Sequence, residues 1–91
     1  MIKGNKMSKY KANIEITLRK SILDVQGKTV EKALHSIGYE NISEVRIGKF
    51  ISLEIESDNQ DFALEKVDNA CKDLLANPII EDYKISLELI N

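Results

Sequence analysis

The sequence predicts an α+β fold, a two-layer sandwich in which a small, mainly antiparallel sheet of three to four strands carries two helices on one face. Three observations lead to this prediction. Apolar and polar residues alternate near both ends of the chain, in segments 10–19 and 83–89. Segments 25–37 and 59–76 instead repeat apolar residues at helical spacing. A further segment with alternating apolar and polar residues, 44–56, separates the two helices, so strands and helices alternate along the chain.

The first strand and the first helix follow from local signals. The strand begins near Tyr10, and its apolar face consists of Ala12, Ile14, Ile16 and Leu18. Asp24 is a candidate N-cap, because its side chain can accept a hydrogen bond from a free N–H of the first turn. Gly38 is suited to end this helix, since glycine tolerates the left-handed conformation common at that position. The apolar stripe of the helix is Val30, Ala33, Leu34 and Ile37.

The second helix and the last strand are predicted in the same way. Asp58 or Asn59 can cap the helix, and Pro78 ends it because the residue before a proline avoids the α region. The stripe of this helix is Ala63, Leu64, Val67, Ala70 or Cys71, Leu74 and Leu75. The apolar positions of the closing strand are Tyr83, Ile85, Leu87 and Leu89.

The middle segment leaves two models open. Its aliphatic residues, which all occupy odd positions, are Val45, Ile47, Ile51, Leu53 and Ile55. A two-residue hairpin at Gly48-Lys49 would mix polar and apolar residues on each face, so it is disfavoured. A hairpin with a three-residue loop at 48–50, or one continuous strand with an irregularity near Gly48, keeps the apolar set together.

The continuous model has a consequence for assembly. A strand of about 12 residues would be roughly 40 Å long, whereas a compact domain of this size has a radius of gyration near ~12 Å. Such a strand would bend or project toward a partner. We therefore expect it to mediate homodimerisation by edge pairing.

Composition excludes several classes of protein. The 91 residues carry 13 Lys and Arg against 15 Asp and Glu, a net charge of −2, which argues against a nucleic-acid partner. A single cysteine cannot form an internal disulfide framework, and no apolar run is long enough for a signal peptide or a membrane span. We expect a cytoplasmic chain without a membrane partner, with a flexible extension at 1–8 and one domain at 9–91.

The residues show no catalytic pattern. His35 is the only imidazole, and Cys71 falls on the apolar stripe of a helix, so we expect packing roles for both and no metal ligand. The segment Gly27-Lys28-Thr29 is similar to the end of a phosphate-binding loop. Position 22, where that motif needs its earlier glycine, is Ile, so the loop is rejected. We therefore predict no catalytic residue in this chain.

Three ordered blocks, which together span most of 9–89, resemble one known family. The first block is Thr17-Leu18-Arg19, Ile22-Leu23-Asp24-Val25-Gln26-Gly27-Lys28 and Val30-Glu31-Lys32-Ala33-Leu34-His35-Ser36-Ile37-Gly38-Tyr39. The others are Val45-Arg46-Ile47-Gly48-Lys49-Phe50-Ile51 and Leu74-Leu75-Ala76-Asn77-Pro78-Ile79-Ile80-Glu81-Asp82-Tyr83. They resemble PurS, the small subunit of bacterial and archaeal phosphoribosylformylglycinamidine synthase. Val25 departs from the family's Asp-Pro-Gln-Gly pattern, which removes a helix-start preference but no chemical group.

The resemblance implies a non-catalytic subunit of a ligase complex in purine biosynthesis. That complex converts formylglycinamide ribonucleotide, glutamine and ATP to formylglycinamidine ribonucleotide, glutamate, ADP and phosphate. The implied partners are a second copy of this chain, in a dimer or higher homo-oligomer, a large synthetase subunit and a glutaminase subunit. The chain would bridge the last two and support ammonia transfer. No cofactor is implied for this chain itself, while ATP and magnesium are expected on the large subunit.

The resemblance also suggests where partners bind. The candidate partner-interface residues are Asp24, Gln26, Gly27, Lys28, Arg46, Gly48 and Lys49. An alternative interpretation is that the two glycines serve backbone geometry and the charges are only solvated. A competing hypothesis for the whole chain is a small regulatory ligand-binding module, because a strand–helix sandwich with a free helix N-terminus resembles amino-acid-sensing domains.

Overall fold

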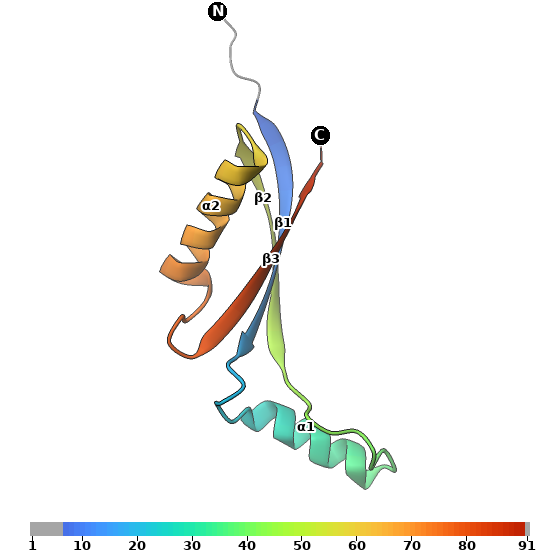
Figure 1. Ribbon diagram of the computed structural model, residues 1–91. Coiled ribbons are helices and arrows are strands. Elements are labelled where there is room, and N and C mark those ends of the chain that lie inside the picture. The colour runs from blue at the N-terminus through green and yellow to red at the C-terminus, as the bar shows by residue number, and fades with distance from the viewer. Residues whose placement is uncertain (1–6, 91) are drawn as a thin grey trace, which may run out of the picture.

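The computed structural model describes residues 7–90. The elements in chain order are β1 (Ser8–Leu18), α1 (Val25–Ser36), β2 (Gly48–Ser57), α2 (Gln60–Ala70), the short π-helix η1 (Cys71–Leu75) and β3 (Glu81–Leu89). The three strands form an antiparallel sheet in the order β2-β1-β3 (Figure 1), which confirms the α+β prediction. Residues 1–6 of the predicted extension lie outside the described residues, and its last residue, Ser8, already belongs to β1.

The register of the sheet places the apolar residues of all three strands on one face. Ile14 at the centre of β1 is paired with Ile51 of β2 and with Ile85 of β3. Because side chains alternate between faces, the neighbouring apolar positions two residues away share this face. The buried core residues there are Ala12, Ile14, Ile16, Val67, Cys71 and Ala76. The opposite face carries mainly charged and polar side chains, as the alternation predicts.

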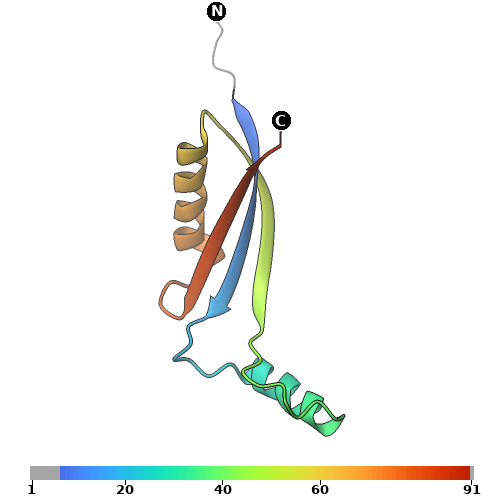
Figure 2. The same ribbon diagram turned by 45° about the vertical axis from the view of Figure 1, so that its right-hand side comes forward.

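Helix α2 covers the apolar face, and it packs against all three strands (Figure 2). Its N-cap is Asn59, whose Oδ1 accepts a hydrogen bond from the Phe62 N–H at 2.8 Å. Ala63, Val67 and Cys71, spaced four residues apart, face the sheet and are at most 2% exposed. The predicted burial of the Cys71 thiol is therefore confirmed, and this burial raises its pKa.

The end of this helical region differs from the predicted stripe. Leu74 belongs to the stripe by spacing, yet it is 82% exposed, while Leu75 is half-buried against the core. The reason is the π-helical turn η1, which holds more residues per turn than an α-helix and so rotates the following side chains. Leu64, also in the predicted stripe, is 43% exposed.

Helix α1 corrects the expectation that both helices lie on one face of the sheet. In residues 7–90 only α2 packs on the sheet, whereas α1 lies beyond one end of it (Figures 1 and 2). The chain measures 66 × 27 × 14 Å, and its radius of gyration is 18.2 Å. A compact domain of this length would have a radius of gyration of about 12 Å. The molecule is thus elongated, with a sheet-and-α2 body and a projecting α1.

The middle segment also differs from both models that the sequence left open. It forms a single strand, so the hairpin is excluded, but β2 begins only at Gly48. Val45 and Ile47 have the parity of the strand without belonging to it, because residues 42–47 return alongside α1 instead. We call residues 42–47 the strap.

Candidate functional site

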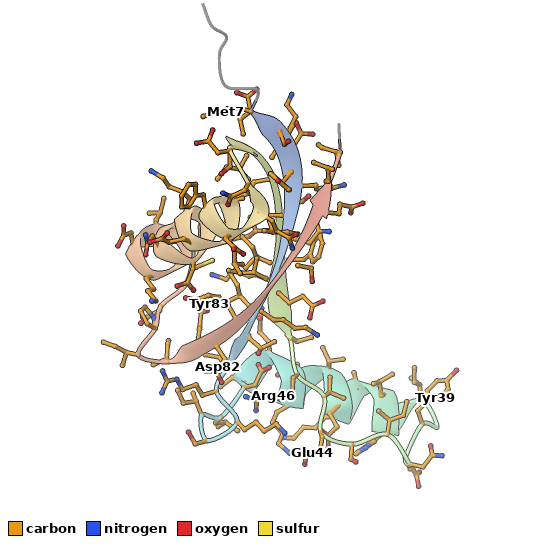
Figure 3. The ribbon with its side chains drawn as sticks, turned by 45° about the horizontal axis from the view of Figure 1, so that its top comes forward. Met7, Tyr39, Glu44, Arg46, Asp82 and Tyr83 are labelled. Carbon is orange, nitrogen blue, oxygen red and sulfur yellow. The ribbon has the colours of Figure 1, made fainter. Side chains whose placement is uncertain are left out.

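The seven candidate interface residues lie where α1 meets the end of the sheet. Asp24 is the N-cap of α1, and Gln26, Gly27 and Lys28 form its first turn. Arg46 is the next-to-last residue of the strap, and Gly48 and Lys49 begin β2. We call this region, residues 16–28 and 45–49, the junction. Figure 3 labels Arg46 there, between the end of the sheet and the start of α1.

Asp24 connects the two chain segments of the junction. Its Oδ1 accepts a hydrogen bond from the Gly27 N–H at 2.9 Å, as an N-cap does, and its Oδ2 accepts one from the Ile47 N–H at 2.6 Å. The residue is 4% exposed. The hydrogen bonds from Gly27 and Ile47 lower the pKa of this carboxyl below its ordinary value, and the nearby Arg46 contributes in the same direction while burial opposes them. Asp24 is therefore ionised at neutral pH.

The two glycines of the junction allow backbones to approach closely. A Cβ on Gly27 would lie 2.2 Å from the carbonyl oxygen of Val45, and one on Gly48 would lie 2.5 Å from that of Ile16. Both distances are well below van der Waals contact, and both neighbours are backbone atoms. The backbone-geometry interpretation therefore accounts for both positions, whatever else they contact in a complex.

Arg46 holds the loop that leads into α1. Its Nη2 donates to the carbonyl oxygens of Leu18 at 3.2 Å, Arg19 at 2.9 Å and Ile22 at 3.2 Å. The Arg19 carbonyl also accepts from the Ile22 N–H at 2.9 Å, so the guanidinium reinforces this turn as well as binding the carbonyls of Leu18 and Ile22. Arg46 thus fixes the course of the chain between β1 and α1.

The strap is attached along one face of α1. The Val45 N–H donates to Glu31 Oε1 at 3.3 Å, and His35 Nε2 lies 2.6 Å from the Ile42 carbonyl oxygen, to which it donates. Glu31 and His35 follow Asp24 and Gly27 at intervals of three or four residues, which places all four on one face of the helix. The packing role predicted for His35 therefore takes the form of a hydrogen bond to the strap.

The remaining three candidate residues are open to solvent. Gln26 is exposed, and the ammonium groups of Lys28 and Lys49 lie 4.0 Å and 3.7 Å from carboxylates of Glu31 and Glu81. Exposed ion pairs of this kind contribute little to stability. Between them lies a cavity of about 260 Å³, lined by Ile16, Leu18, Asp24, Gln26, Ile47, Gly48, Lys49 and Glu81.

A second polar cluster, which sequence reasoning missed, lies between α2 and β3. The Tyr83 hydroxyl donates to Asp68 Oδ1 at 2.5 Å, and Lys72 Nζ lies 3.0 Å from Asp68 Oδ2. The hydrogen bond to Asp68 raises the pKa of Tyr83 to about 12. The same bond, followed by Lys72, lowers the pKa of Asp68. The i,i+4 spacing of Asp68 and Lys72 was visible in the sequence, but alternation assigned Tyr83 only to the core.

We predict that Tyr83→Phe lowers the free energy of unfolding by about 1 kcal/mol at pH 7, the usual worth of one hydrogen bond. Because the folded pKa lies above the ordinary value of 10, this contribution is complete below pH 10 and is lost as the pH rises toward 12. An ultraviolet titration of the phenols checks the assignment. The step near pH 12 should disappear in Tyr83→Phe and persist in Tyr39→Phe; its persistence in Tyr83→Phe would refute it.

Two further observations concern the part of the chain that the structure describes. No group of three or more His, Cys, Asp or Glu residues within 7–90 is placed to hold a metal ion. None of the helices in that range is long and apolar enough to cross a membrane.

Similarity to known proteins extends over nearly the whole chain. Residues 11–89 match the model of PurS, a family described as phosphoribosylformylglycinamidine (FGAM) synthase. The PurS subunit of Methanocaldococcus jannaschii is 42% identical over 81 residues, which cover 89% of this chain and 98% of that protein. The Bacillus subtilis subunit is 43% identical over 79 residues, which cover 87% and 93%.

Solved structures agree with the sequence comparison. The PurS structure of Thermotoga maritima superposes with a TM-score of 0.84 at 32% identity and covers 91% of this chain and 95% of that one. A chain in the structure of PurLQS from Thermotoga maritima gives a TM-score of 0.83 at 34% identity, covering 90% and 100%. Sequence and structure together show that this chain belongs to the PurS family of phosphoribosylformylglycinamidine synthase.

Proposed function

We propose that this chain is the PurS subunit of phosphoribosylformylglycinamidine synthase and acts in purine biosynthesis as a non-catalytic assembly subunit. It bridges the large synthetase subunit and the glutaminase subunit and supports the transfer of ammonia between them. In this assignment ATP and magnesium bind to the large subunit. The observation that carries the proposal is the full-length similarity to a chain in the PurLQS structure, at 34% identity and a TM-score of 0.83.

The shape of the molecule supports a bridging role. A radius of gyration of 18.2 Å and a length of 66 Å give a short chain two well-separated ends, the sheet-and-α2 body and α1. Each end exposes large apolar side chains, such as Leu89 at the far end of β3, which is 59% exposed, and Ile37 just after α1, which is 70% exposed. Exposed apolar surface of this kind is typical of contact with other proteins.

Reconstitution tests the assignment. The large subunit and the glutaminase subunit from the same organism are mixed with and without this chain, and product formation is measured with glutamine or with ammonium as the nitrogen source. We expect omission to abolish the glutamine-dependent rate and to leave the ammonium-dependent rate. We also expect the mass of the complex to fall. An unchanged glutamine-dependent rate and an unchanged mass would refute the proposed role.

We further propose that the chain forms a homodimer. An apolar seam along α1 and the residues that flank it is exposed in the described chain and consists of Leu23, Val30, Ala33 and Ile37. The apolar end of the sheet beyond α2 is likewise open, at the 260 Å³ cavity of the junction. β2 is an edge strand, so one side of its backbone is free to pair, as edge pairing of the middle strand requires. A second copy supplies matching surfaces for all three.

The homodimer predicts a strong effect of a charge on the seam. Ile37→Asp should weaken self-association at least about tenfold, because an unpaired carboxylate is costly to bury. Sedimentation velocity across a dilution series measures the effect, with Phe62→Asp, an exposed apolar position on α2, as the control. A wild-type chain that sediments as a single copy at all concentrations, or an Ile37→Asp variant as dimeric as wild type, would contradict the homodimer.

A further inference from the structure

The orientation of α1 relative to the sheet depends on the junction. Helix α1 does not pack on the sheet in the described chain, so the sheet itself does not hold it in place. Two connections link α1 to the body, residues 19–24 on the way in and residues 37–47 on the way out. Within a single chain, the angle of α1 to the sheet is therefore set by how these two connections are tied to each other.

Asp24 and Arg46 form hydrogen bonds between the two connections, and each lies on a different connection. Asp24, at the end of the incoming connection, accepts a hydrogen bond from the Ile47 N–H of the outgoing one. Arg46, on the outgoing connection, donates to carbonyl oxygens of the incoming one, including those of Arg19 and Ile22. The two ties are therefore reciprocal and lie next to each other at the base of α1.

Close packing restricts the movement of α1 that the hydrogen bonds alone would still allow. The Gly27 Cα lies so near the Val45 carbonyl that even a methyl group would overlap it. Gly48 is packed against the Ile16 carbonyl in the same way. Asp24, at 4% exposure, is shielded from water that could compete for its hydrogen bonds. The base of α1 is consequently closely packed and held by hydrogen bonds in both directions, and we call it the joint.

We infer that Asp24 and Arg46 are positioning residues, which fix α1 at one angle to the body so that the chain enters the synthase complex with its two ends already in place. This inference rests on the proposed function. A preorganised bridge binds two partners without first losing conformational freedom, whereas a loose one loses it on binding. The effect of loosening the joint is therefore on affinity for the complex, and saturating amounts of the chain restore the rate.

Asp24→Asn and Arg46→Ala loosen the joint in different ways. The Gly27 and Ile47 N–H groups bond to different oxygens of Asp24, and asparagine replaces one of these oxygens with an NH2 group that cannot accept, so one of the two hydrogen bonds is lost. Asparagine remains a good N-cap, so α1 itself persists. Arg46→Ala removes the donor to the incoming connection. The controls, on exposed positions away from the junction, are Asp58→Asn and Lys66→Ala.

The experiment combines two measurements on the full chain. Amide hydrogen exchange reports whether residues 25–47 loosen while the protected amides of β1 stay unchanged. A titration of each variant into the large and glutaminase subunits gives the concentration for half-maximal glutamine-dependent rate. For both junction variants we expect about tenfold faster exchange in 25–47 and an about tenfold higher half-saturating concentration, with the plateau rate retained.

The outcomes separate the inference from its alternatives. Faster exchange with an unchanged half-saturating concentration would overturn the positioning role. A higher half-saturating concentration with unchanged exchange would overturn it too, since Asp24 and Arg46 would then act by direct contact with a partner. The failure of the proposed function looks different, because then omitting the wild-type chain leaves the glutamine-dependent rate unchanged.

Discussion

Replacing Ile14 with alanine is expected to lower the free energy of unfolding by about 4 kcal/mol. The side chain is fully buried at the centre of the middle strand, between Ile51 and Ile85 and beneath α2. Its removal loses the transfer free energy of the deleted atoms and leaves a cavity that the antiparallel sheet cannot close, because strands on both sides fix its walls. A loss of this size is a large part of the stability of a domain of this length.

Urea unfolding at one fixed protein concentration measures this loss, since self-association makes stability depend on concentration. The control is Ile79→Ala, which deletes the same atoms at a position that is 80% exposed, and should change the free energy by less than about 0.5 kcal/mol. Similar effects at both positions would mean that the core does not lie where the sheet register places it.

Gly27→Ala is expected to destabilise α1 and the strap by about 2 kcal/mol without unfolding the sheet. Alanine favours a helix over glycine by about 1 kcal/mol, but its methyl group would lie 2.2 Å from the Val45 carbonyl oxygen. The strap must shift, and the shift breaks hydrogen bonds to the carboxylates of Asp24 and Glu31, which are each worth about 1.5 kcal/mol because the acceptors are charged. The overlap therefore outweighs the helix propensity.

Hydrogen exchange of the Val45 and Ile47 amides measures the effect directly, because both donate to α1 side chains. Lys32→Ala, at an exposed position of the same helix, is the matched control and should leave their exchange unchanged. Equal or slower exchange in Gly27→Ala would show that the strap yields without cost, and the joint would then not be tightly packed.

Much of the fold was predictable from local patterns. Alternation located β1 and β3, and the N-caps Asp24 and Asn59 were both among the predicted residues. The pattern failed for Val45 and Ile47, because alternation indicates which side chains share a face only while the chain continues as a strand. The position of α1 was not predictable either. An amphipathic stripe indicates that a helix needs a cover, and it does not indicate whether that cover is its own sheet or another chain.

The seven candidate residues meet at the junction, but the contacts that they make there were not predictable from the sequence. Capping signals identified Asp24, yet its second hydrogen bond, to Ile47, depends on a tertiary arrangement that no local pattern encodes. The same holds for Arg46, whose acceptors are backbone carbonyls and so leave no mark in the sequence. Partner contacts by Gln26, Lys28 and Lys49 stay predictions.

The burial of Cys71 gives this protein a built-in reporter. It is the single cysteine of the sequence, it is fully buried between α2 and the sheet, and burial raises its pKa away from the reactive thiolate. A thiol reagent can therefore label the chain only when α2 lifts from the sheet. The labelling rate of the unmodified protein records openings of the body alone, independently of any motion of α1.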